Sequence, residues 1–117
     1  MTRRRALRSS VGALLIAALA LVAMVVPAAA QADDVPQKAR DVLAQIEQRH
    51  GEPPPGYVGG RTFQNRERQL PRGAYREYDV NPKVRGRDRG AERIVIERRS
   101  GRAYYTPDHY ETFVPMN

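Results

Sequence analysis

The segment AYREYDV occupies residues 74–80, and a second segment, AERIVIE, occupies residues 91–97. In both, apolar and polar side chains alternate with the period of two that is typical of a half-buried β-strand. The apolar side chains that share one face of these strands are Tyr78, Val80, Ile94 and Ile96. The alternation therefore predicts two strands of one sheet, with this face turned toward a core.

The opposite faces of the two strands carry charged side chains. Glu77 lies on that face of the first strand, and Arg93 lies on that face of the second. If the apolar face packs on a helix, both residues project from the open face of the same sheet. A carboxylate there can act as a general base, and a guanidinium can bind phosphate oxygens.

Residues 35–46 predict an amphipathic helix. Apolar side chains recur at positions i, i+4, i+7, i+8 and i+11, which form one helical face: Val35, Ala39, Val42, Leu43 and Ile46. Asp33-Asp34 provides an N-cap, and Gly51 provides a stop. We expect His50, which precedes this glycine, to be a capping or solvated residue.

Shorter strand-like segments complete the fold. They lie at Thr62-Phe63, at residues 103–106 and near residues 112–114, and turn sequences separate them. The chain thus combines one helix with four or five short, hairpin-connected strands. This order predicts an α+β fold in which one N-terminal helix packs on a small antiparallel β-sheet.

Residues 1–32 have the layout of a secretory signal peptide. Arginines begin the segment, an apolar run of 16 residues follows at 11–26, and A-x-A patterns predict cleavage after Ala30 or Ala32. The alternative, a membrane anchor, needs a run of roughly 20 apolar residues. We therefore expect a secreted, extracellular protein with no membrane association after cleavage, and a single domain at residues 33–117. The arginines admit the general or the twin-arginine export route.

Charge and cysteine content restrict the function. The chain has no cysteine, which excludes thiolate zinc sites and cysteine nucleophiles. Its formal net charge is +7, and outside the predicted signal peptide the arginines gather between Arg85 and Arg102. Such a local positive field suits a polyanion, although a solvated surface is the alternative.

The segment TPDHY, residues 106–110, contains a histidine. Together with Glu77 and two arginines, this histidine forms a set of groups that can transfer protons and bind phosphate. His109 supplies an imidazole that can donate a proton as general acid, and Glu77 supplies a carboxylate that can accept one. Arg89 and Arg93 supply guanidinium groups that can stabilise charge on phosphorus. RNA brings its own nucleophile, the 2′-hydroxyl, so these groups suffice without a metal or a cofactor.

Each of these residues also has a purely structural interpretation. Glu77 could pair with Arg93 across the strands, and Arg89 could be a solvated loop residue. His109 could be a surface residue that is hydrogen-bonded to Asp108 or Tyr110.

Four motifs occur in an order that resembles the secreted bacterial guanyl-specific ribonucleases, the barnase-like group. They are FQNRE at 63–67, YREY at 75–78, RGAERI at 89–94 and YYTPDHY at 104–110. The resemblance implies the microbial ribonuclease fold and an extracellular, guanyl-preferring endoribonuclease. Such an enzyme cleaves single-stranded RNA by transesterification to a 2′,3′-cyclic phosphate and then hydrolyses this product to a 3′-phosphate.

The resemblance also implies roles for particular residues. Glu77 would be the general base and His109 the general acid. Arg89 and Arg93 would hold the scissile phosphate, with help from the Tyr110 hydroxyl.

The guanine pocket implied by the resemblance is the turn formed by Gln64, Asn65, Arg66 and Glu67. The Glu67 carboxylate would accept hydrogen bonds from guanine N1–H and the exocyclic amine, a donor pair that distinguishes guanine. Phe63 and Tyr110 would stack on the base. Phe63 could equally be a core residue.

The arginine-lined site and the resemblance together imply an acidic, barstar-like inhibitor protein. We expect the chain to be a monomer. The chain departs from relatives that carry a disulfide, and its turn after Pro71 is short. No motif matches the lysine that some relatives place near the phosphate. The competing interpretation is a catalytically inactive, secreted module that binds RNA or another polyanion.

Overall fold

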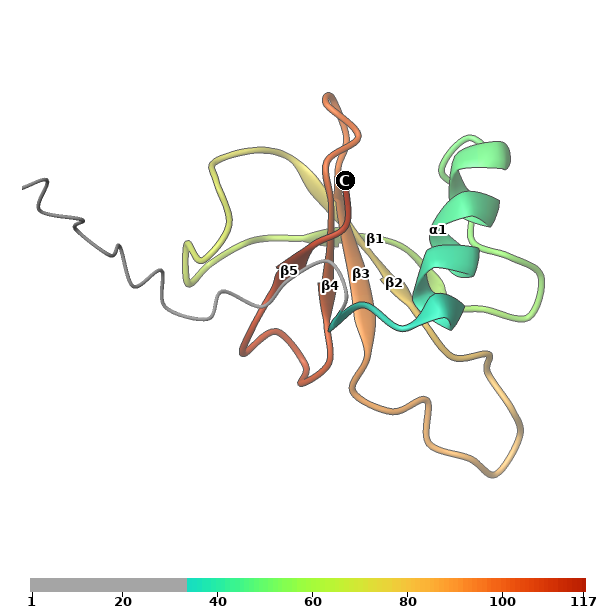
Figure 1. Cartoon of the computed structure of the whole chain (residues 1–117). Helices are drawn as coiled ribbons and strands as arrows, with labels where there is room; N and C mark the ends of the chain where they lie inside the picture. Colours follow the sequence, from blue (N-terminus) through green and yellow to red (C-terminus); the bar gives the residue numbers. More distant parts are fainter. Residues whose placement is uncertain (1–33) are drawn as a thin grey trace, which may run out of the picture.

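The computed structural model describes residues 34–117 (Figure 1). The predicted signal peptide and its cleavage sites lie outside these residues. The elements are, in order, α1 Gln37–Gln48, β1 Gly59–Phe63, β2 Tyr75–Asp79, β3 Arg93–Glu97, β4 Ala103–Thr106 and β5 Val114–Pro115. The strands form one sheet of order β1-β2-β3-β4-β5, in which every pairing is antiparallel. The predicted α+β class is confirmed.

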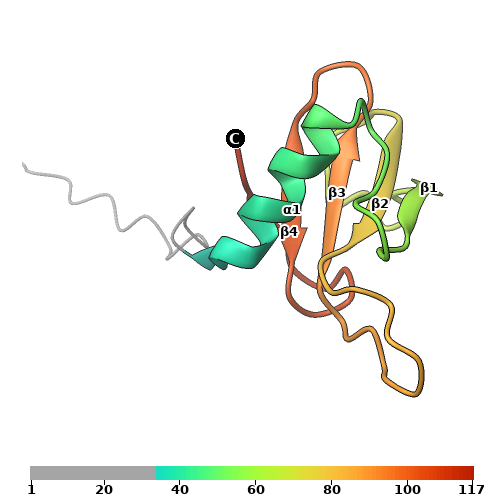
Figure 2. The same cartoon turned by 90° about the vertical axis from the view of Figure 1, so that its right-hand side faces the viewer.

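Helix α1 lies across one face of the sheet (Figure 2). The helix and sheet side chains that meet there include Ala39, Val42, Leu43, Ile46, Tyr78, Val80, Ile94 and Tyr105, which form the first core. Ala39 and Ile94 have no exposed surface. Because full burial of a Val, Leu or Ile side chain stabilises by about 1.5–3 kcal/mol, this face holds the helix on the sheet. The apolar faces predicted from the sequence periodicities are confirmed.

The start of α1 differs from the prediction. Pro36, with φ −65° and ψ 148°, occupies the N-cap position, and no side chain caps the helix. Its carbonyl accepts the N–H of Ala39 at 3.0 Å, while Asp34 lies in the preceding turn. The predicted Asp33-Asp34 cap is therefore wrong, because proline's fixed φ already suits this position.

The predicted end of α1 is confirmed. Gly51 has φ +91°, and its N–H donates to the carbonyl of Ile46 at 2.9 Å. This left-handed geometry favours glycine after a helix. His50 beside it is exposed, as expected of a residue at the helix end.

The other face of the sheet, called here the cleft face, carries a smaller second core. Its buried members are Leu70, Tyr75 and Val95, and partly buried Phe63, Tyr104, Tyr110 and Phe113 pack against them. The β1–β2 loop curves away on this side of the sheet, opposite α1 (Figure 1). The cleft face is therefore less open than the sequence predicted, because loop residues cover part of it.

Strand pairing places the charged residues of the cleft face in rows. Glu77 pairs with Val95, and Asp79 pairs with Arg93. At the edge of the sheet, β1 begins at Gly59, earlier than predicted, and a bulge separates Gly59 from Arg61. A Cβ atom on Gly59 would lie 2.5 Å from the Tyr78 ring, so only glycine allows this approach.

A polar contact ties α1 to the sheet end. The Glu92 carboxylate accepts hydrogen bonds from Lys38 Nζ at 2.7 Å and from the Tyr105 hydroxyl at 2.6 Å. The structure also shows that α1, the helix within residues 34–117, is too short and too polar to cross a bilayer.

Candidate active site

A cleft of about 620 Å³ opens between the β1–β2 loop and the β4–β5 loop. Residues predicted from the sequence that line it are Phe63, Gln64, Asn65, Arg66, Glu67, His109 and Tyr110. These residues come from two segments that are about forty positions apart in the chain, and the antiparallel sheet brings them together. The tertiary structure thus joins the predicted base pocket to the predicted general acid.

Tyr110 connects this cleft to the carboxylate on β2. Its hydroxyl donates a short hydrogen bond to Glu77 Oε2. Burial raises the pKa of the Tyr110 hydroxyl, and the Glu77 carboxylate raises it further, so the hydroxyl stays protonated and can donate. The ring centroids of Tyr110 and His109 lie 4.7 Å apart. Tyr110 therefore contacts both members of the candidate acid–base pair.

Asp79 joins the two arginines that the sequence singles out. Its carboxylate binds Arg89 Nη1 at 2.8 Å and Arg93 Nε at 3.0 Å. The Asp79 side chain is only 5% exposed, whereas the Arg89 side chain is 33% exposed. One buried carboxylate thus sets the orientation of both guanidinium groups.

The remaining bonds of Arg93 restrict it further. Its Nη1 donates to the carbonyls of Gly90 and Glu92 at 2.9 and 2.8 Å. Together with the Asp79 bond, these contacts engage Nε and Nη1, so Nη2 is the one guanidinium nitrogen of Arg93 that they do not engage. Arg93 also lies beside the Tyr110 hydroxyl. Its positive charge and a hydrogen bond with it counteract part of the rise in the pKa of Tyr110.

This geometry decides between interpretations that the sequence leaves open. Arg93 pairs with Asp79 rather than Glu77, so the predicted alternative of a Glu77–Arg93 pair is wrong. Arg89 is ion-paired and half-buried, so it is not simply a solvated loop residue. Within residues 34–117, the exposed His109 imidazole makes no hydrogen bond, and its ring can face a ligand.

The loop that carries His109 has an unusual backbone. His109 and Tyr110 have φ of +55° and +75°, a region that non-glycine residues adopt at a cost of order 1 kcal/mol or more each. Thr106, fully buried, compensates: its hydroxyl donates to Asp108 Oδ1 at 2.9 Å and accepts the Tyr110 N–H at 3.0 Å. Asp108 also accepts the Thr112 N–H at 2.8 Å. These bonds hold the two rings in place.

The base-pocket turn has its own scaffold. The Asn65 side chain donates to the Leu70 carbonyl at 2.9 Å and accepts the Leu70 N–H at 3.2 Å. Its φ of +51° lies in the left-handed region that asparagine tolerates well. Asn65 therefore shapes the turn with its side chain.

Gln69 also lines the cleft, although no sequence pattern singled it out. Its Nε2 donates to Glu67 Oε2 at 3.0 Å and to the Tyr110 carbonyl at 3.1 Å. These two bonds link the Glu67 carboxylate to the loop that carries His109. The core interpretation of Phe63 is confirmed, because its half-buried ring packs on the second core, and its centroid lies 5.0 Å from that of the stacked Tyr110 ring. That Phe63 stacks on a base stays a prediction.

The site residues that the sequence did not reveal are those that hold other site residues in position. Asp79, Thr106, Asp108 and Gln69 all act through another site residue. Of these residues, only Thr106 and Asp108 could have been predicted from the sequence. They stand in the pattern Thr-Pro-Asp before His109, and Thr and Asp side chains often form hydrogen bonds with the nearby backbone in turns. In the part of the chain that the structure describes, no cluster of His, Asp and Glu could hold a metal ion.

Comparison with known proteins gives consistent matches. A family model described as ribonuclease matches residues 23–117. Guanyl-specific ribonuclease St from Saccharopolyspora erythraea is 43% identical over 83 residues, which cover 68% of this chain and 78% of that protein. Guanyl-specific ribonuclease Sa from Kitasatospora aureofaciens is 41% identical over 83 residues, with coverage of 68% and 82%. A crystal structure of ribonuclease Sa2 with guanosine-2′-cyclophosphate superposes with a TM-score of 0.57 and 34% identity, and covers 74% of this chain and 91% of that one.

Proposed function

The chain belongs to the microbial guanyl-specific ribonucleases, and on that premise we propose how its own residues cleave RNA. It is a guanyl-preferring endoribonuclease. The substrate we propose is single-stranded RNA, and the cleavage site is the phosphodiester on the 3′ side of guanosine. The observation that carries the residue assignment is the hydrogen bond from Tyr110 to Glu77 at the edge of the cleft that His109 lines.

In the first step, the Glu77 carboxylate accepts the proton of the guanosine 2′-hydroxyl. The 2′-oxygen attacks phosphorus, and the bond to the 5′-oxygen of the next nucleotide breaks. His109, protonated, donates its proton to that leaving oxygen. Arg89 and Arg93 bind the non-bridging oxygens as negative charge develops on them.

The product of the first step is a 2′,3′-cyclic phosphate, which is hydrolysed with the roles reversed. His109 now accepts a proton from water, whose oxygen attacks phosphorus. Glu77 returns its proton to the 2′-oxygen, and a 3′-phosphate remains. The Tyr110 hydroxyl, held protonated by burial, can donate to a phosphate oxygen when it leaves Glu77.

Guanine recognition is proposed for the turn at residues 64–67. The Glu67 carboxylate, held by Gln69, accepts from N1–H and the exocyclic amine of the base. Phe63 and Tyr110 offer stacking surfaces, and backbone N–H groups of the turn face the guanine O6. Adenine lacks that donor pair, so the pocket discriminates against it.

A dinucleotide assay tests these assignments. The protein, beginning at residue 33, is mixed in EDTA with GpU or ApU, and the cyclic phosphate is followed. We expect rapid, guanine-selective cleavage that His109→Ala and Glu77→Ala each reduce by a factor of about a hundred or more. Retained activity in either variant would contradict its role. A folded protein that binds RNA without cleaving it would support the inactive binding module instead.

Two further proposals concern the protein in the cell. We propose secretion with cleavage after Ala30 or Ala32, which N-terminal sequencing of protein from culture medium would test. We also propose that the monomeric enzyme is blocked before export by an acidic, barstar-like inhibitor that covers the arginine-rich site. The absence of any tight, salt-sensitive complex with acidic proteins of the producing cell would contradict this inhibitor.

A further inference from the structure

Residues 89–92, called here the entry segment, lead from the β2–β3 loop into β3 and hold several site residues through their backbone. Two carbonyls of the entry segment accept hydrogen bonds from Arg93 Nη1, at 2.9 and 2.8 Å. The carbonyl of Ala91 accepts the backbone N–H of His109 at 3.0 Å. Arg89 is itself part of the segment. The positions of both arginines and of the His109 loop therefore depend on where the entry segment lies.

Apolar burial does not fix the entry segment. It lies outside the strands, and it buries no apolar side chain, because Ala91 is exposed and Gly90 has no side chain. The hydrophobic effect therefore does little to hold it. Gly90 also has φ of +73°, in the left-handed region that glycine adopts readily. A segment of this kind keeps one conformation only if polar groups of neighbouring elements bind it.

Glu92 binds the entry segment to two neighbouring elements. Its side chain is 22% exposed, and its carboxylate accepts hydrogen bonds from Lys38 Nζ at 2.7 Å and from the Tyr105 hydroxyl at 2.6 Å. Lys38 lies on α1, and Tyr105 lies on β4. Burial by itself would raise the pKa of Glu92, but the hydrogen bonds that it accepts, that from Lys38 foremost, lower this pKa. The carboxylate is therefore ionised at neutral pH and can bind both partners.

Asn81, at the other end of the β2–β3 loop, belongs to the same network. Its Oδ1 accepts a hydrogen bond from Lys38 Nζ at 3.2 Å. Its Nδ2 donates weakly, at 3.4 Å each, to the Arg89 carbonyl and to Glu92 Oε1. A Cβ atom on Gly90 would lie 3.4 Å from the same Nδ2, so the amide packs directly against the entry segment. One lysine of α1 thus binds both ends of the loop.

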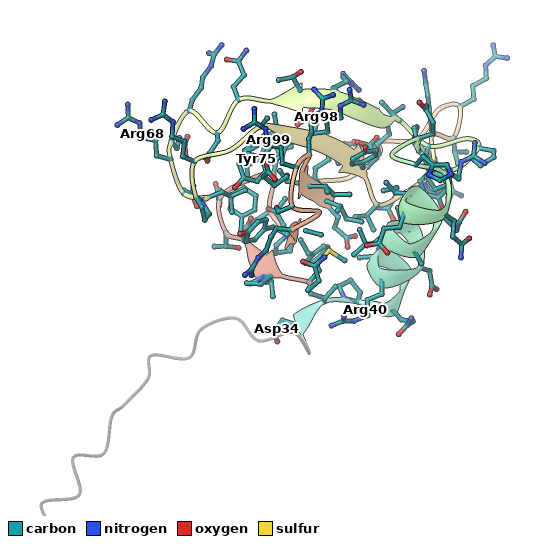
Figure 3. All side chains as sticks on the ribbon, turned by 90° about the horizontal axis from the view of Figure 1, so that it is seen from above. Asp34, Arg40, Arg68, Tyr75, Arg98 and Arg99 are labelled. Carbon is teal, nitrogen blue, oxygen red and sulfur yellow. The ribbon has the colours of Figure 1, made fainter. Side chains whose placement is uncertain are left out.

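Lys38 has no direct access to the cleft. Within residues 34–117, other residues line the cleft. In a view from above, Figure 3 shows Asp34 and Arg40, which flank Lys38 in the chain, on the opposite side of the molecule from Arg68, which follows the base-pocket turn. At physiological salt, charge effects between exposed groups are screened beyond about 8 Å. An effect of Lys38 on catalysis therefore passes through the residues that it binds.

We propose that Glu92 is a positioning residue for the cleavage of RNA. Bound to Lys38 and Tyr105, its side chain fixes the entry segment, which in turn fixes the two arginines of the site and the loop of the general acid. This inference rests on the proposed function, because it assumes that those groups act on the scissile phosphate. Glu92 itself takes no part in the chemistry. Helix α1 thereby supports the phosphate side of the site and not the base pocket.

The test separates positioning from stability by means of kcat. Glu92→Gln removes the charge and keeps the length of the side chain, and Lys38→Met removes the ammonium group and keeps the apolar stem. The matched control, Glu47→Gln, removes an exposed carboxylate near the end of α1. kcat and KM for GpU are measured at a temperature at which thermal unfolding shows each protein to be folded.

We expect Glu92→Gln to lower kcat about tenfold and Lys38→Met to lower it about threefold, with KM little changed. This pattern is typical of an interaction made chiefly in the transition state, as expected for arginines that bind the charge developing on the phosphate. Glu47→Gln should match the wild type. If kcat of Glu92→Gln stays within about twofold of the wild type, the inference is refuted even if Tm falls, because the role of Glu92 is then purely structural.

Combining the two substitutions gives a readout that a purely structural role would not produce. In the Glu92→Gln background, Lys38→Met should cause no further loss of kcat, because the link through which it acts is already broken. A loss that persists in that background refutes the inference, and so does a Lys38→Met variant as active as the wild type. Should Glu92→Gln not fold, Lys38→Met and Tyr105→Phe, which each remove one hydrogen bond, decide in its place: an unchanged kcat in either refutes the inference.

A binding measurement separates this inference from the enzyme assignment. Calorimetry gives the affinities of the wild type and of Glu92→Gln for guanosine and for guanosine 3′-phosphate, whose dianionic phosphate resembles the charge of the transition state. We expect the affinity for guanosine 3′-phosphate to fall about fivefold and that for guanosine to stay unchanged. Equal binding of guanosine 3′-phosphate by the two proteins, or an equal loss for guanosine, refutes the positioning role. If the wild type does not cleave GpU, the proposed function fails, and the binding result still decides on Glu92.

Discussion

Replacement of Asp79 by asparagine tests whether one buried carboxylate positions both of the arginines that we propose as phosphate ligands. Asp79 accepts from Arg89 and Arg93, and the asparagine keeps one neutral acceptor oxygen but loses the charge. Breaking a buried ion pair costs about 3–5 kcal/mol. Because Arg89 is 33% exposed and can be resolvated, we expect a loss near the lower limit, about 3 kcal/mol. In a domain of this size that lowers Tm by roughly 12–24 °C.

The same change should impair catalysis in a particular way. With both guanidinium groups less well oriented, we expect kcat/KM for GpU to fall about a hundredfold at a temperature where the variant is folded, which corresponds to about 2.7 kcal/mol. Calorimetry gives the affinities for guanosine and for guanosine 3′-phosphate. Guanosine binding should be unchanged, since the pocket of Glu67 is intact, while guanosine 3′-phosphate binding should weaken at least tenfold.

The matched control for this experiment is Asp41→Asn, which removes an exposed carboxylate from α1. It should leave Tm and both affinities close to wild type. The reasoning is refuted if folded Asp79→Asn retains kcat/KM within about twofold. It is equally refuted if both ligands lose the same affinity, because that would indicate general damage rather than loss of arginine orientation.

Two further predictions concern single side chains. Tyr110→Phe removes the hydroxyl that bonds Glu77 but keeps the ring, so kcat/KM should fall about tenfold with little change in guanosine affinity; an unaltered rate would contradict the role of the hydroxyl. Hydrogen bonds from Ser100 lower the pKa of Glu97 from 4.5 to about 2, so its charge stabilises the fold above the ordinary pKa, and this contribution is lost as pH falls through about 2. Glu97→Gln should therefore lower Tm at pH 7 but hardly at pH 2, as thermal unfolding at both pH values would show; a constant difference would contradict it.

Several parts of the site could be predicted because they depend on short-range sequence patterns. The four ordered motifs singled out the turn at residues 64–67 and the segment with His109 and Tyr110, which line one cleft. The side-chain alternation placed Glu77 on the face away from the helix. Residues that act through a neighbour, such as Asp79 and Gln69, were not found. In the strand pattern Asp79 is simply the next polar residue on its face, and nothing local shows which cation it will bind.

The sequence by itself determined the fold class, the buried faces of α1, β2 and β3, and the end of the helix at Gly51. Each of these follows from a local period or from the backbone freedom of one residue, so neighbours in the chain suffice. Only the tertiary structure decided that Arg93 pairs with Asp79 rather than Glu77. That choice depends on the register of β2 against β3. It also decided that Tyr110 reaches Glu77, a contact between residues 33 positions apart. The alternation of apolar and polar side chains fixes the face on which each residue lies. It leaves open which residue of the next strand lies opposite, because that depends on the geometry of the connecting loop and on the packing of the sheet.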